Sequence, residues 1–296
     1  MSDLRANLFA PVLRGLERVM PAGVYCGTLY PVAWLRALIH SCIKRPPSIP
    51  WPEGLPGLKP VRRSRLYRLP AYLNRTFEYI PDRVSRPKWR DYVRYGGLER
   101  VLGLVESGRP VVLVFAHFGP YEQLRLWLRG GGLAVTMFAG GTAEDRSALK
   151  RRKDAWSLRP EVAATFHRDQ LAEAVRHLKA DRPLAMSIDS TSARDIQVPA
   201  GGGWCFRMPT GAIRLARRHG AALVPCWTYN EGPWRVVVQL GAPVESVRLK
   251  VSDAAIGEEL LGAMLPIWLA RPGEWTPQLA ASFSKGTMGS GLDRRE

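Results

Sequence analysis

The chain has few cysteines and no common catalytic signature. Its four cysteines lie far apart and form no CxxC pair: Cys26, Cys42, Cys205 and Cys226. This spacing argues against a zinc module and against a disulfide framework, so we expect reduced thiols in a cytosolic environment and no bound metal. The sequence contains no GxxxxGK[ST], GxGxxG, GxSxG or HExxH motif. The common nucleotide-binding, hydrolase and zinc-protease classes are therefore excluded.

Acidic residues and long apolar runs are also scarce. The chain has 26 Asp and Glu against 43 Lys and Arg, a net charge of +17. Such an excess favours a polyanionic partner, meaning nucleic acid, an anionic membrane surface or an acidic carrier protein. The N-terminus lacks the order of regions that defines a signal peptide. The uncharged run Met20–Leu35 is interrupted by prolines and glycines and is shorter than the ~20 residues of a spanning helix.

The N-terminal segment has an apolar helical face. Its apolar residues recur near one side of a helix: Leu4, Leu8, Val12, Leu16 and Val19. This pattern is typical of a helix that lies in a membrane interface, and equally of one that packs on the body of a protein. We expect an N-terminal helical extension with a Pro-rich connection over 1–65, an α/β domain over 66–282 and a disordered tail over 283–296.

From about residue 90, predicted strands alternate with predicted helices. The expected strands are 111–116, 133–138, 183–189, 221–229 and 234–240. The expected helices are 94–107, 121–129, 143–158, 169–180, 210–220 and 252–270. Alternation of this kind predicts an α/β fold with a mainly parallel sheet flanked by helices.

The stretch "VVLVFAHFGPYEQLRLWL" passes from a buried strand into a helix. At the junction, His117 and Glu122 form an H-x4-E pair around a Gly-Pro turn. Loops at the carboxyl ends of parallel strands form ligand sites, and a carboxylate there can orient an imidazole as a general base. No neighbouring Ser or Cys offers a nucleophile, so the nucleophile would be a hydroxyl of the substrate. The alternative is a structural histidine that caps a helix and binds a nearby acid.

A second stretch, "MSIDSTSARDIQVPAGGGWCFRMPTGAIRLARRHG", places Asp189 at the end of a strand on the same sheet edge. We expect Asp189 to position a substrate, and the glycines 201–203 to form a flexible loop before a helix capped by Thr210. The alternative is a surface loop ahead of an ordinary helix. Three arginines are candidate substrate ligands, or alternatively parts of solvated faces: Arg151, Arg152 and Arg168.

Together, these stretches resemble the bacterial lysophospholipid acyltransferase superfamily, and within it the lauroyl/myristoyl acyltransferases of lipid A biosynthesis. "VVLVFAHFGPYE" is similar to that family's strand followed by a histidine and an acid. "LAMSIDS" and "TGAIRLARRHGAALVPCW" resemble its next motifs in the same order, over roughly residues 90–240. "RPGEWTP" is weakly similar to the family's C-terminal motif. The resemblance implies a glycerolipid acyltransferase-like fold.

The resemblance also implies a mechanism. His117 would act as the base on an acceptor hydroxyl, with Glu122 orienting it, and a fatty acyl thioester of acyl carrier protein or coenzyme A would be the donor. Backbone amides or Arg168 would stabilise the tetrahedral intermediate, with no cofactor. The protein would bind the cytoplasmic face of the bacterial inner membrane peripherally, at an anionic lipid surface.

The sequence departs from this family at two motifs. It has "GPYE" where the lipid A enzymes have Gly-Asn-Trp-Glu, and Asp189-Ser190 where they have Asp-Gln. The acceptor is therefore open between lipid A, another lipid, a glycolipid and a secondary-metabolite hydroxyl. Two further hypotheses remain: a non-catalytic protein that binds acyl chains or carrier proteins on the same scaffold, and a basic nucleic-acid-binding protein, although no nucleic-acid module is present.

Overall fold

A computed structural model describes residue 12 and residues 15–43, 51–58, 87–138, 165–166, 170–180, 182–190, 194–248 and 250–286. Its centre is a seven-stranded sheet of order β1-β9-β8-β2-β5-β3-β4. The strands are β1 (Val93–Gly96), β2 (Val111–Phe115), β3 (Thr136–Phe138), β4 (Thr165–Phe166), β5 (Leu184–Ser187), β8 (Ala222–Gly232) and β9 (Arg235–Leu240).

The prediction of a mainly parallel α/β sheet is confirmed. Within the central sheet, every pairing of described strands is parallel except that of β8 with β9. The inner strand β2 is buried along its whole length. Its continuous apolar run is typical of a strand covered by helices on both faces.

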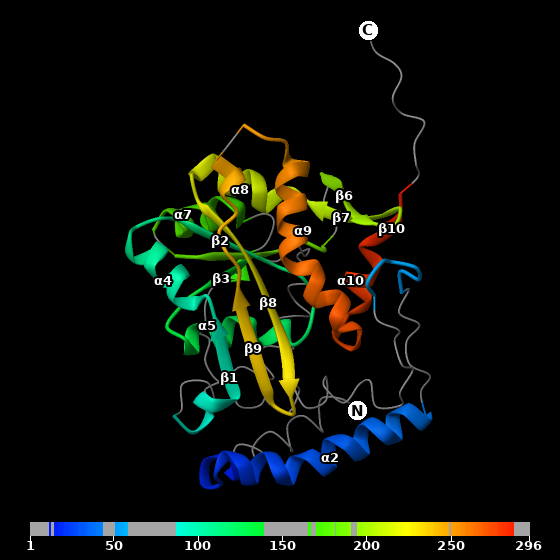
Figure 1. The fold of residues 1–296 in the computed structure, drawn as a ribbon. Coiled ribbons are helices and arrows are strands. Elements are labelled where there is room, and N and C mark those ends of the chain that lie inside the picture. Colours follow the sequence, from blue (N-terminus) through cyan, green and yellow to red (C-terminus); the bar gives the residue numbers. More distant parts are fainter. Residues whose placement is uncertain are drawn as a thin grey trace.

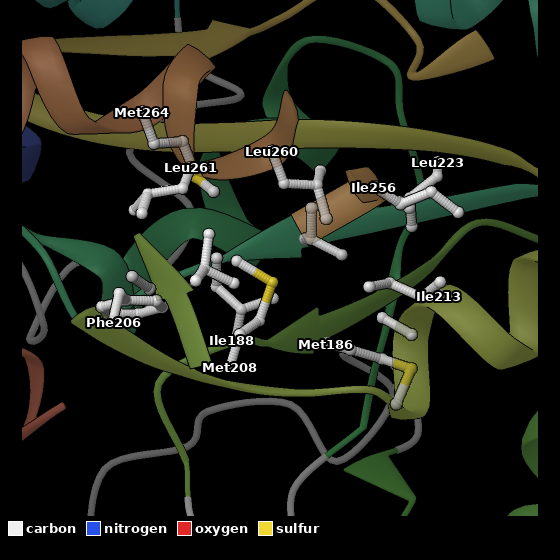
Figure 2. Close-up of a cluster of buried hydrophobic side chains, with 14 of the residues drawn as sticks. Met186, Ile188, Phe206, Met208, Ile213, Leu223, Ile256, Leu260, Leu261 and Met264 are labelled. Atoms are coloured by element: carbon white, nitrogen blue, oxygen red, sulfur yellow. The ribbon is translucent and has the colours of Figure 1, made fainter. Parts of the chain in front are cut away.

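Helices cover both faces of this sheet (Figure 1). One face packs against α4 (Leu98–Glu106) and α5 (Leu124–Gly130). The other packs against α7 (Leu171–Lys179), α8 (Gly211–His219) and α9 (Asp253–Ala270). Figure 2 shows this second core, where α9 contributes side chains at helical spacing, including Ile256, Leu260 and Met264.

A smaller antiparallel sheet of order β10-β7-β6 lies beside α9 (Figure 1). It consists of β6 (Asp195–Gly201), β7 (Trp204–Pro209) and β10 (Phe283–Lys285). One expectation is therefore wrong, and a second changes at its start. The glycines at 201–203 form the tight turn of a β-hairpin, all with positive φ, and not a flexible loop. The first residues of the predicted disordered tail form β10, where Phe283 packs on Phe206 with ring centroids 5.0 Å apart, and residues 287–296 of that prediction lie outside the described residues.

The predicted helix over 94–107 is also wrong at its start, where Val93–Gly96 forms β1 and pairs with β9 before α4 begins. The predicted helix over 143–158 and the predicted domain boundary at residue 65 lie outside the described residues. No disulfide joins Cys26, Cys205 and Cys226.

The N-terminal helix α2 (Ala22–Ile43) lies across the tip of the β8–β9 hairpin (Figure 1). Its buried side packs on Trp89 and Trp234, and Tyr30 contacts Trp234 edge-on at 6.0 Å. Other positions of α2 and the turns before it expose apolar side chains: Val12, Leu16, Val19, Val24, Val32, Trp34, Leu35 and Ile39. No helix in the described part of the chain has the length and apolar character needed to cross a membrane.

Candidate active site

His117 and Asp189 are brought together by two neighbouring strands. Phe115 at the end of β2 pairs with Ser187 at the end of β5. Each candidate residue follows its strand at the same offset, and the Ile188 N–H donates to the Phe115 carbonyl oxygen at 2.8 Å. Because the two strands are parallel and in this register, the two side chains reach the same edge of the sheet side by side.

Asp189 binds His117 through two hydrogen bonds. The His117 Nδ1 lies 2.7 Å from Oδ1, and the His117 backbone N–H donates to Oδ2 at 2.8 Å. The Asp189 side chain is fully buried, while 19% of the His117 side chain is exposed. A carboxylate only accepts hydrogen bonds, so Nδ1 carries the hydrogen and Nε2 is the nitrogen able to accept a proton.

The turn after His117 requires glycine at position 119. Gly119 has a φ of 59°, and a Cβ built there would lie 2.2 Å from the Thr228 carbonyl oxygen. The turn therefore packs directly against the backbone of β8. Beyond it, the Tyr121 ring meets the imidazole edge-on, with centroids 4.5 Å apart. The imidazole is thus held by Asp189 through Nδ1 and by Tyr121 through a ring contact.

The other predicted site residues have different outcomes. Glu122 lies in a short 3₁₀ turn, Tyr121–Gln123, before α5. Its side chain is not among those described, so the predicted orienting contact stays a prediction. Arg151, Arg152 and Arg168 lie outside the described residues, and their predicted binding roles also stay predictions. Asp189 lies on the predicted sheet edge and contacts His117, and its predicted role in positioning a substrate stays a prediction.

A group of residues in and after "RPGEWTP" was not predicted from the sequence. Thr276 and Ser282 donate hydrogen bonds to the carbonyl oxygens of His117 and Asp189, at 2.6 and 3.2 Å. The weak motif similarity of this stretch was the one indication that the sequence offered. Among the described residues, no group of three His, Cys, Asp or Glu side chains gathers as metal ligands.

Glu274 is a buried acid directly behind the His117 turn. Its carboxyl group accepts hydrogen bonds from Asn230 N and Nδ2 at 3.0 Å and lies 3.6 Å from the Arg271 guanidinium. Burial raises the pKa of Glu274 from its ordinary value of 4.5 to about 7, against the opposing effects of Asn230 and Arg271. The charged form of this group is therefore disfavoured in the folded protein.

This pKa predicts a pH-dependent stability. Between pH 4.5 and 7 the folded state binds a proton at Glu274 that the unfolded state releases, so the stabilising contribution is complete below pH 4.5 and is lost as the pH rises to about 7. In the wild type, the unfolding free energy should fall with rising pH across this window by up to about 1.4 kcal/mol per pH unit because of Glu274. Glu274→Gln, which cannot titrate, should lack this contribution to the slope. Urea unfolding of both proteins at several pH values measures this, and parallel curves would contradict it.

No family model matches the sequence, and no curated protein matches it. One similar solved structure is the crystal structure of the 1-acyl-sn-glycerophosphate (LPA) acyltransferase PlsC from Thermotoga maritima. The TM-score is 0.41 and the identity 13%, covering 93% of this chain and 100% of that chain. A likeness at this level gives no support for an activity, so a function has to be inferred from the chain's own residues.

Proposed function

We propose that the protein is a peripheral membrane O-acyltransferase. It moves a fatty acyl group from a thioester, carried by acyl carrier protein or coenzyme A, to a hydroxyl of a lipid or glycolipid. One observation carries the proposal: Asp189 holds Nδ1 of His117 at 2.7 Å, which leaves Nε2 as the basic nitrogen at the carboxyl edge of the sheet. The order of motifs along the sequence, which resembles the lysophospholipid acyltransferases, supports the choice of reaction.

In the proposed reaction, Nε2 of His117 takes the proton of the acceptor hydroxyl, and the oxygen attacks the thioester carbonyl carbon. The tetrahedral intermediate then collapses with cleavage of the carbon–sulfur bond, and the departing thiolate takes the proton from Nε2. The Asp189 carboxylate stabilises the transient imidazolium. In the part of the chain that the structure describes, no serine or cysteine is hydrogen-bonded to Nε2, so the nucleophile belongs to the substrate. Backbone amides or Arg168 are proposed to stabilise the oxyanion.

The orienting acid can be identified by two matched substitutions. Asp189→Asn should lower kcat by up to about 10⁴-fold, because an amide in place of the carboxylate no longer fixes the tautomer or stabilises the imidazolium. Glu122→Gln makes the same chemical change in the acid predicted from the sequence. Steady-state kinetics of both variants, with folding checked by circular dichroism, compare the two acids. A larger loss in Glu122→Gln would assign the orienting role to Glu122.

Membrane attachment is proposed through the apolar side of α2. The β8–β9 hairpin continues from the carboxyl edge of the sheet, where His117 lies, to α2. The exposed apolar side chains of α2 and the turns before it, together with the net charge of +17, suit the surface of an anionic bilayer. An acceptor dissolved in the membrane would then lie on the same side as the base. The surface proposed is the cytoplasmic face of the bacterial inner membrane.

Vesicle binding tests this attachment. Val24→Asp with Val32→Asp adds two charges to side chains that are 53% and 61% exposed, and should weaken binding to anionic vesicles about tenfold or more. Gly103→Asp with Gly262→Asp adds the same charges at open positions of α4 and α9 and is the control. Equal binding by the two double variants would show that α2 is not the attachment surface.

Acyl transfer itself is tested with purified protein, radiolabelled acyl thioesters on carrier protein and on coenzyme A, and total bacterial membrane lipid. A labelled lipid whose new bond is identified as an ester by mass spectrometry is the expected product, and it names donor and acceptor class together. Thioester binding without turnover would replace the proposal with a non-catalytic acyl- or carrier-binding protein. Nucleic-acid binding that falls steeply with salt, without transfer, would replace it with the third hypothesis.

A further inference from the structure

One C-terminal segment contacts the main chain of both His117 and Asp189. It consists of a 3₁₀ turn, Pro272–Glu274, and the short helix α10 (Pro277–Ala281) with the residues that flank it. Thr276 Oγ1 donates to the His117 carbonyl oxygen at 2.6 Å. Ser282 Oγ lies 3.2 Å from the Asp189 carbonyl oxygen and 3.2 Å from the Gln278 carbonyl oxygen, so it shares its one hydrogen between these two acceptors. The two residues of the candidate dyad, which follow different strands, are thus held by hydroxyl groups of a single third segment.

The same segment is also joined to the His117 turn through the backbone. The Gly119 N–H donates to the Glu274 carbonyl oxygen at 2.9 Å, and Phe118 forms a β-bridge with Trp275. The Trp275 indole N–H donates to the Trp268 carbonyl oxygen at 2.7 Å, which fixes the segment to the end of α9. Because this segment is fixed at several points, it can hold the His117 turn in one position.

We propose that Thr276 and Ser282 are positioning residues, which set the separation between His117 and Asp189 by holding the carbonyl group of each. The inference rests on the proposed function for its kinetic part. The Nδ1–Oδ1 distance of 2.7 Å depends on the relative placement of two loops that no shared strand or helix contains. A displacement of an ångström in a catalytic group lowers rates by orders of magnitude, so a tie between the loops has a direct effect on the base.

Thr276→Val tests the proposal, since it removes the hydroxyl and keeps the shape. We expect kcat to fall about tenfold or more while KM stays within about twofold, because the loss concerns the base and not substrate affinity. We also expect the downfield proton NMR signal of His117 Nδ1–H to move or to exchange faster with water. That signal is assigned by its loss in His117→Ala. Thr276→Ser keeps the hydroxyl and should restore both properties.

A matched control separates positioning from helix stability. Thr276 Oγ1 also caps α10 by accepting a hydrogen bond from Leu279 N at 3.1 Å. Ser252 Oγ caps α9 in the same way, accepting from Ala255 N at 3.1 Å, and contacts neither dyad residue. Ser252→Ala should lower the melting temperature, as Thr276→Val does, but leave kcat and the NMR signal unchanged. Equal losses of kcat in both variants would overturn the proposal.

Ser282→Ala provides a second test if Thr276→Val does not fold. It removes the donor to the Asp189 carbonyl oxygen and should lower kcat and shift the same NMR signal. Retention of kcat and of the signal in either folded variant would overturn the proposal. If the wild-type protein transfers no acyl group, the proposed function fails on its own, and the NMR comparison still decides whether Thr276 and Ser282 position the His117–Asp189 pair.

Discussion

His117→Ala is expected to lower kcat for acyl transfer by about 10²- to 10⁴-fold, the usual contribution of a positioned general base. The imidazole is the group that Asp189 orients at this edge, through a bond of 2.7 Å to Nδ1, while the His117 backbone N–H donates to the same carboxylate at 2.8 Å. Its removal leaves the acceptor hydroxyl without a proton acceptor at the moment of attack. Single-turnover measurement of ester formation gives the rate of the chemical step directly.

The control is His219→Ala, at the end of α8. It removes an imidazole that has no part in the proposed reaction, and transfer should continue at the wild-type rate. Equal rates for wild type and His117→Ala would show that His117 is not the base. The interpretation of His117 as a structural, helix-capping histidine would then replace it.

Gly119→Ala should destabilise the fold by about 3 kcal/mol. Two costs combine at this position: a left-handed backbone with φ 59°, and a contact of 2.2 Å between the new Cβ and the Thr228 carbonyl oxygen. Thr228 pairs with β9. The nearby Asn230 is held by hydrogen bonds to Glu274 and Arg271, so the neighbouring backbone has little freedom to move.

Gly108→Ala is the matched control, since Gly108 has a φ of 72° but a Cβ added there would meet nothing within 4 Å. It should cost only the backbone term, about 1 kcal/mol. Urea unfolding of the two variants gives the steric contribution as their difference. A difference near zero would mean that the His117 turn can move away from β8.

The sequence was most informative where a local pattern determines a long-range arrangement. The apolar runs of β2 and β5 predicted inner parallel strands, and residues that directly follow such strands must reach one edge. The sequence alone could therefore place His117 and Asp189 on the same edge. It could not predict their mutual hydrogen bonds, because strand order is decided by packing over the whole chain, and β5 lies beside β2 although β3 comes before it in sequence.

The contacts of the C-terminal segment were beyond sequence reasoning for a related reason. Thr276 meets His117 across 159 residues of chain. The residues next to Thr276 and His117 in the sequence do not indicate that the two residues meet. The hairpin β6–β7 was missed for the opposite reason: its three consecutive glycines were interpreted as flexibility, whereas left-handed glycines also form the tightest turns.

The length of the β8–β9 hairpin has a mechanical consequence. Strand β8 pairs with β2 only as far as Pro225, whereas its pairing with β9 continues to Gly232. Beyond Pro225, β8 extends past its pairing with β2, while β9 pairs with β1 from Val236 to Gln239, so most of the outer part is a three-stranded ribbon. Arg271 and Glu274 support it from one side by hydrogen bonds to Asn230. A displacement of α2, which packs on the tip of this hairpin, is therefore resisted both by β1 and by the segment that also holds His117.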